Sequence, residues 1–93
     1  MVYAYVSLMV TNTESLKAYR EVAGKALAKH GGAVISVSGQ FTVLDGTPDT
    51  PDMAVIVSFP NKESAISWSN DPDLADVHAL RRNAAVSDIF LLG

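Results

Sequence analysis

The alternation of apolar and polar residues predicts a β-strand over residues 2–10. One face of that strand carries Val2, Ala4, Val6, Leu8 and Val10, and the other carries Tyr3, Tyr5, Ser7 and Met9. From residue 14 to about residue 29 the apolar positions recur at helical spacing instead, which predicts an amphipathic helix. Asn12 can cap this helix, and Gly31 with Gly32 ends it, because glycine readily takes the left-handed backbone conformation.

The second half of the chain predicts three further strands and a helix that is broken in two. The strands are expected at residues 33–44, with a bend or bulge at Gly39, at residues 53–59 and at residues 86–92. A polar loop covers residues 45–52. Asn61 can cap a short helix, and Asp71-Pro72-Asp73 restarts the chain as a second helix that ends near Ala85.

This order of elements predicts an α+β fold of the ferredoxin-like βαββαβ type. Such a fold is a four-stranded antiparallel sheet with its helices on one face. A length of 93 residues without a linker predicts a single domain over residues 1–93. The uncovered sheet face is expected to carry Tyr3, Tyr5, Met9, Val34 and Ile56. Covering apolar surface stabilises by about 25 cal/mol per Å², so a homodimer with sheet packed on sheet is expected.

The composition excludes several kinds of chemistry and of partner. The sequence has no cysteine, which rules out disulfides, thiolate nucleophiles and zinc–thiolate sites. A net charge of −3 argues against nucleic-acid and anionic-membrane partners. No apolar run has the length of a membrane span, and the first strand lacks the basic start of a signal peptide, so a cytoplasmic location is expected.

Metal and cofactor binding are not expected either. His30 and His78 are the only histidines, and neither has a second ligand at metal-binding spacing. His30 is expected to interact with the last carbonyls of the first helix instead.

His78 and Arg81 form the candidate catalytic pair. They are three residues apart on the predicted second helix and therefore share a face. Together they can hold a carboxylate or enolate oxygen, with His78 as a proton shuttle near neutral pH. The alternative is a solvated pair in which the arginine complements the helix dipole.

A second candidate site comes from hydroxyl groups on the strands. Alternation places Tyr5 and Ser7 on one face of the first strand, and Ser36 and Ser38 on one face of the second. Inside a dimer these side chains suit a small, mostly apolar ligand, or else form a wet interface. Trp68 is either a wall of such a ligand site or a core residue whose indole N–H has one partner.

The sequence resembles the bacterial domain-of-unknown-function family 1330, a group within the dimeric α+β barrel proteins. The resemblance rests on a series of short motifs spread over nearly the whole chain. These are Gly31-Gly32, Leu44-Asp45-Gly46, Val57-Ser58-Phe59-Pro60, Ala65 with Trp68, Asp71-Pro72-Asp73, Leu80-Arg81 and Ala84-Ala85. Two positions depart from the family pattern: Val37-Ser38-Gly39 replaces a common Arg-Gly-Gly run, and Leu74 replaces a usual tyrosine.

The resemblance implies the fold and a dimer but does not choose an activity. Proteins with the same barrel include cofactor-independent monooxygenases, haem-handling proteins and lactone isomerases. Two functions therefore stay open. One is a homodimer that binds or transforms a small apolar or carbonyl-bearing metabolite, and the other is a non-catalytic assembly protein whose main role is dimerisation. A closed cavity of about 300 Å³ or more that reaches His78 and Arg81, or the serine-bearing face of the strands, favours the first, and a tightly filled interior at both places removes it.

Overall fold

Strands and helices follow one another in the predicted order along residues 1–93, all of which the computed structural model describes. The strands are β1 (Val2–Val10), β2 (Ala33–Ser38), β3 (Met53–Phe59) and β4 (Ala85–Leu92). The helical elements are α1 (Thr13–Lys29), α2 (Lys62–Asn70), the short 3₁₀ helix η1 (Pro72–Leu74) and α3 (Ala75–Ala84). This order confirms the predicted βαββαβ arrangement.

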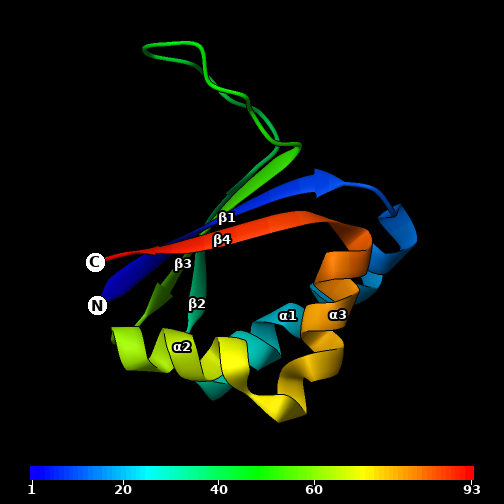
Figure 1. The fold of residues 1–93 in the computed structure, drawn as a ribbon, viewed down its shortest axis with the longest axis vertical. Helices are drawn as coiled ribbons and strands as arrows, with labels where there is room; N and C mark the ends of the chain where they lie inside the picture. Colours follow the sequence, from blue (N-terminus) through cyan, green and yellow to red (C-terminus); the bar gives the residue numbers. More distant parts are fainter.

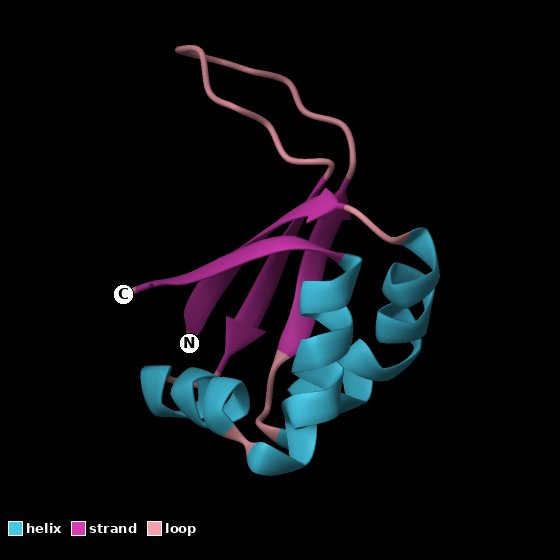
Figure 2. Cartoon of the chain, turned by 45° about the vertical axis from the view of Figure 1, so that its right-hand side comes forward, coloured by secondary structure: helices cyan, strands magenta, loops and turns pink.

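The four strands form one antiparallel sheet in the order β2-β3-β1-β4, so that β1 and β3 are central. The helices cover one face of this sheet, and the segment from residue 39 to residue 52 projects beyond its end (Figures 1 and 2). Ala4, Val6 and Leu8 of β1 are buried on the covered face, which confirms the predicted alternation. Phe59 of β3 is the largest fully buried side chain of the core. None of the helices has the length and apolarity needed to cross a lipid bilayer.

Three side-chain caps start the helical elements where the sequence predicts them. The Asn12 side chain accepts hydrogen bonds from the backbone N–H groups of Glu14 and Ser15. Asn61 accepts from the N–H of Ser64, and Asp71 accepts from the N–H of Asp73. Each cap satisfies donors of the first helical turn that have no partner within the helix.

The second strand differs from its prediction in length and in register. It ends at Ser38 rather than at Leu44, because β3 begins only at Met53 and offers no strand for residues 39–44 to pair with. The bulge is at Ile35, not at Gly39, since Val34 pairs with Val57 and Ser36 pairs with the adjacent Ile56.

The register of β2 also corrects the predicted content of the open sheet face. Val34 pairs with the buried Val57 and therefore lies on the side that the helices cover. Residues opposite one another in an antiparallel pair share a face. The open face consequently carries Tyr3, Tyr5, Met9 and Ile56 as expected, but not Val34.

His30 contacts a carboxylate rather than the helix carbonyls that the sequence suggested. Its Nε2 atom is 2.8 Å from Oδ2 of Asp71, and the Lys29 ammonium is 2.7 Å from the same oxygen. These contacts join the end of α1 to the start of η1. The Lys29 ammonium, His30 and the N–H of Asp73 together hold the pKa of Asp71 well below its usual range.

We expect an Asp71→Asn variant to unfold at a lower temperature than the wild type at neutral pH. A carboxyl group whose pKa is lowered by folding stabilises the protein above its unfolded pKa of about 4, and that contribution is lost as the pH falls towards the folded value. The difference in melting temperature is therefore expected to narrow below about pH 4. Circular dichroism melts across this range measure it, with Asp45→Asn in the exposed loop as the control. A difference in melting temperature that does not change with pH would contradict the lowered pKa of Asp71.

We expect a glycine-to-alanine substitution to have opposite effects on stability at Gly31 and at Gly24. Gly31 has φ +73°, and an added Cβ would lie 2.7 Å from Cγ of Pro60, so Gly31→Ala is expected to cost roughly 1–2 kcal/mol or more. Gly24 lies within α1 with nothing within 4 Å of an added Cβ, so Gly24→Ala is expected to stabilise by about 0.5–1 kcal/mol. Urea denaturation measures both changes in the free energy of unfolding. Equal effects of the two substitutions would contradict the left-handed role of Gly31.

Candidate functional site

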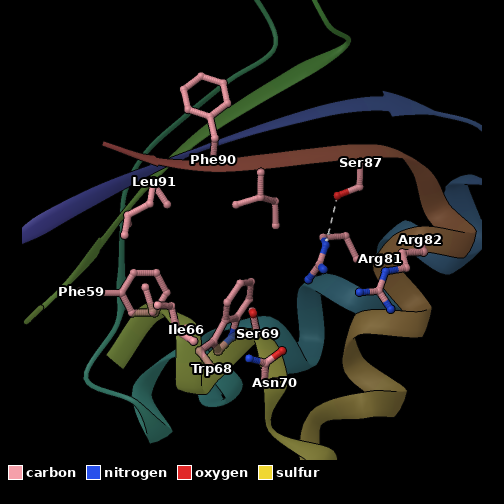
Figure 3. A pocket seen from close by; sticks show the side chains of 13 residues that line it. Phe59, Ile66, Trp68, Ser69, Asn70, Arg81, Arg82, Ser87, Phe90 and Leu91 are labelled. Carbon is pink, nitrogen blue, oxygen red and sulfur yellow. Dashed lines mark hydrogen bonds between the residues drawn. The ribbon is translucent and has the colours of Figure 1, made fainter. Parts of the chain in front are cut away.

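A cavity of about 410 Å³ lies between α2, the end of α3 and the helix-covered side of β4 (Figure 3). It is open to solvent rather than closed, and Arg81 lines it whereas His78 does not. Its apolar lining residues are Ala4, Phe59, Ala65, Ile66, Trp68, Ile89, Phe90 and Leu91. Its polar lining residues are Ser69, Asn70, Arg81, Arg82 and Ser87. Phe90 points to the far side of β4 in Figure 3, away from the other labelled side chains. The cavity therefore has an apolar end near Phe59 and a cationic end near Arg81.

Arg81 is buried at the cationic end without a negatively charged partner. Its side chain comes from the last turn of α3 and only 5% of the residue is exposed. The Nε atom donates to the hydroxyl of Ser87 at 3.1 Å, and Nη1 donates to Nδ1 of His78 at 2.9 Å. No carboxylate of the chain forms a salt bridge with it. A buried charge without a counter-ion is unfavourable, so this guanidinium is poised to accept an anion.

Two aromatic rings complete the surroundings of the Arg81 guanidinium. Its Cζ atom lies 5.3 Å from the ring centre of Trp68 and 5.8 Å from that of Tyr19. Both distances are in the range of cation–π attraction, which partly compensates the lost hydration of the cation. The hydrogen bonds of Arg81 within the chain involve Nε and Nη1 but not Nη2.

His78 is a neutral imidazole whose two nitrogens are both engaged. Its Nε2 atom is 2.9 Å from the backbone carbonyl of Trp68, which can only accept, and Nδ1 faces the Arg81 donor. The proton therefore lies on Nε2. Burial is the main cause that lowers the pKa of His78, and the positive charge of Arg81 lowers it further. This geometry favours a role in orienting Arg81 over the predicted role of proton shuttle.

The burial of both residues contradicts one of the two interpretations of the pair. His78 is 3% exposed and Arg81 is 5% exposed, so the solvated pair is wrong. The spacing of three residues along α3 does bring the two side chains together, as predicted.

Trp68 is buried between the core and the His78–Arg81 pair. Its ring centre lies 5.7 Å from that of Phe59 and 4.7 Å from that of His78, against which it packs edge to face. The indole Nε1 is buried without a hydrogen-bond partner, so the single partner that the sequence suggested is not found. A buried N–H without an acceptor costs free energy, and Trp68 is one of the residues that line the cavity.

The polar groups of the cavity favour a negatively charged ligand. None of the thirteen lining residues is an aspartate or a glutamate, whereas two are arginines. Arg82 is exposed at the rim and Arg81 is buried within. A carboxylate fits such a set of donors, because it accepts several charge-assisted hydrogen bonds at once.

The structure places the predicted hydroxyl site on the opposite side of the sheet. Tyr5 and Ser36 each pair with Ile56, while Ser7 and Ser38 each pair with Ala54, so all four share the open face. None of them lines the Arg81 cavity. The Ser38 hydroxyl donates to the carbonyl of Gln40, and the Tyr5 ring packs at 5.2 Å against Phe90.

Ser87 is a residue of the candidate site that the sequence patterns did not single out. It belongs to the covered side of β4, where it pairs with the buried Leu8. The alternation Ala85, Ser87, Ile89, Leu91 contains this single hydroxyl among apolar side chains. A polar residue on an otherwise apolar face of a strand is the signal that identifies it.

Comparisons with known proteins agree with the fold. The family model described as domain of unknown function (DUF1330) matches residues 1–93. The crystal structure of RPA0582, a protein of unknown function from Rhodopseudomonas palustris, is similar with a TM-score of 0.76 and 20% identity over 98% of this chain and 79% of that one. The structure of methylated RPA0582 is similar with a TM-score of 0.75 and 19% identity, covering 98% of this chain and 78% of that one. No curated protein matches the sequence. At these identities the likeness concerns the fold alone.

Proposed function

The chain belongs to the DUF1330 family, and from that premise we propose that it binds a small apolar carboxylate through Arg81. The family name carries no activity, so the proposal depends on the chemistry of the cavity. Its single main support is a guanidinium that is 5% exposed, has no counter-ion and lines a cavity of about 410 Å³. A bound anion would supply the missing opposite charge.

The apolar end of the cavity determines the rest of the ligand. Phe59, Ile66 and Leu91 lie there, while Trp68 lies between them and Arg81 in Figure 3. Cavities that bind small metabolites commonly enclose about 300–1,000 Å³ and combine apolar walls with a few polar groups. A molecule with one carboxylate and an apolar body therefore matches both ends of this cavity.

Binding rather than acid–base catalysis is the role that the pair of residues supports. A general base needs a free lone pair within hydrogen-bond reach of the substrate proton. The lone pair of His78 Nδ1 already accepts from Arg81, and its Nε2 proton is donated to Trp68. His78 is thus a positioning residue that fixes the direction of the guanidinium.

Calorimetric titration of the wild type and an Arg81→Met variant with benzoate tests this function. Benzyl alcohol serves as the uncharged probe of similar shape. We expect the wild type to bind benzoate but not benzyl alcohol, and the variant to bind neither. Equal binding of benzoate and benzyl alcohol by the wild type would overturn the role of the charge.

We also propose that the open face of the sheet packs against a second copy of the chain. Tyr3, Met9, Ile35, Val86 and Leu92 are exposed on or beside this face. Contiguous exposed apolar surface of this kind is typical of protein–protein contacts. The projecting segment adds Val43 and Leu44, which are 50% and 93% exposed. This dimer is compatible both with carboxylate binding and with a non-catalytic assembly role. In it Tyr5, Ser7, Ser36 and Ser38 would face the partner.

A further inference from the structure

A second, almost wholly apolar cavity lies on the other side of Trp68. It has a volume of about 270 Å³ and lies between α1 and the covered faces of β1, β2 and β3. Fifteen of its seventeen lining residues are hydrophobic, and Arg20 is the only charged one. A cavity with so few polar groups cannot orient a polar molecule but suits a hydrocarbon chain.

Four residues form a wall that the two cavities share. Ala4, Phe59, Trp68 and Ile89 line both of them. Trp68 is central to this wall, because it packs against Phe59 on one side and contacts Arg81 and His78 on the other. Its Nε1 makes no hydrogen bond, so no polar contact of the indole fixes the ring in this position.

From this arrangement we infer that the ligand is a straight-chain carboxylic acid whose tail passes Trp68 into the apolar cavity. The inference rests on the proposed function, because it takes the carboxylate to be held by Arg81. The cationic end offers the only buried guanidinium, and the apolar cavity continues from the same wall. The carboxylate of an alkanoate therefore contacts the guanidinium, and its hydrocarbon chain extends from there into the apolar cavity.

Chain length is the property that this inference makes measurable. Each methylene buried in an apolar site strengthens binding by about four-fold, from about 0.8 kcal/mol per CH₂. Titration with butyrate, octanoate and dodecanoate is expected to show affinity that rises at each step. The fluorescence of Trp68, the only tryptophan, is expected to change with the longer acids and not with butyrate.

Variants that fill the apolar cavity separate its role from that of the Arg81 cavity. Ala23 lies on α1 and lines only the apolar cavity, so Ala23→Phe is expected to reduce dodecanoate affinity to that of butyrate while butyrate binds as in the wild type. Val37→Trp on β2 fills the same cavity from the sheet and replaces Ala23→Phe if that variant does not fold. Ala28→Phe is the control, because Ala28 is exposed on α1 and lines neither cavity.

The outcomes distinguish this inference from the proposed function. If both filled variants keep the full advantage of dodecanoate over butyrate, the tail lies elsewhere and the inference fails alone. If butyrate binds the wild type and Arg81→Met equally, the carboxylate site itself fails. Loss of the long-chain advantage in the filled variants, with butyrate binding still dependent on Arg81, supports both.

Discussion

An Arg81→Met variant is expected to bind benzoate at least about 100-fold more weakly than the wild type. Hydrogen bonds to a charged group contribute roughly 1.5–3 kcal/mol each, and a factor of 100 corresponds to about 2.7 kcal/mol. Methionine keeps an unbranched apolar side chain against Trp68 and Tyr19 but has no donor and no charge. The loss of affinity therefore reports on the guanidinium rather than on packing.

The same substitution is expected to leave the protein folded. Removing Arg81 leaves Nδ1 of His78 without its donor, which costs about 1–3 kcal/mol. It also removes a buried charge that has no counter-ion, which is favourable. Because these effects oppose each other, we expect the free energy of unfolding to change by no more than about 2 kcal/mol. Urea denaturation checks that the variant titrated is folded.

Two control variants test whether position or overall charge matters. Arg82 is the next residue along α3 and is exposed at the cavity rim, and Lys25 is exposed on α1 away from the cavity. Arg82→Met is expected to weaken benzoate binding by less than about three-fold, in line with the small value of exposed charge pairs. Lys25→Met is expected to have no effect. A loss in Arg82→Met as large as in Arg81→Met would mean that the general field, and not the buried guanidinium, attracts the anion.

The parts of the fold that the sequence predicts correctly depend on local signals. Asn12, Asn61 and Asp71 act on backbone groups within three residues of themselves, so their positions along the chain are enough to identify the caps. The end of β2 depends instead on where β3 begins, which is a property of pairing across the loop. For the same reason the bulge was predicted at Gly39 rather than at Ile35, and Val34 was predicted on the wrong face, because a bulge is defined only relative to the partner strand.

The pairing of His78 with Arg81 was predictable from the sequence, whereas the surroundings of the pair were not. The spacing of His78 and Arg81 on one helix is enough to predict that the two side chains meet. Their burial depends on α2, which places Trp68 against both of them, and no pattern within α3 carries that information. The tautomer of His78 likewise follows from a carbonyl of α2. The charge of the cavity thus became evident only from the tertiary structure.

Ile56→Glu is expected to convert a dimer into a monomer at micromolar concentration. Ile56 lies near the middle of the open face, between Tyr5 of β1 and Ser36 of β2. In a monomer the new carboxylate faces water, but in a dimer of packed sheets it is buried without a partner, which costs several kcal/mol. We expect the dissociation constant to rise by at least about 100-fold, measured by sedimentation equilibrium. Met9→Glu, on the same face, serves if the first variant does not fold.

Ile66→Glu is the matched control, because Ile66 is exposed on α2 on the side of the molecule away from the open face. It introduces the same charge and is expected to leave the dimer intact. A wild type that sediments as a monomer, or a control that dissociates like Ile56→Glu, would contradict packing through the open face.

The monomeric variant Ile56→Glu then separates the two candidate ligand sites. The Arg81 cavity is formed within one chain, so benzoate is expected to bind the monomer, whereas any ligand held by Tyr5 and Ser36 between two sheets would be lost with the dimer.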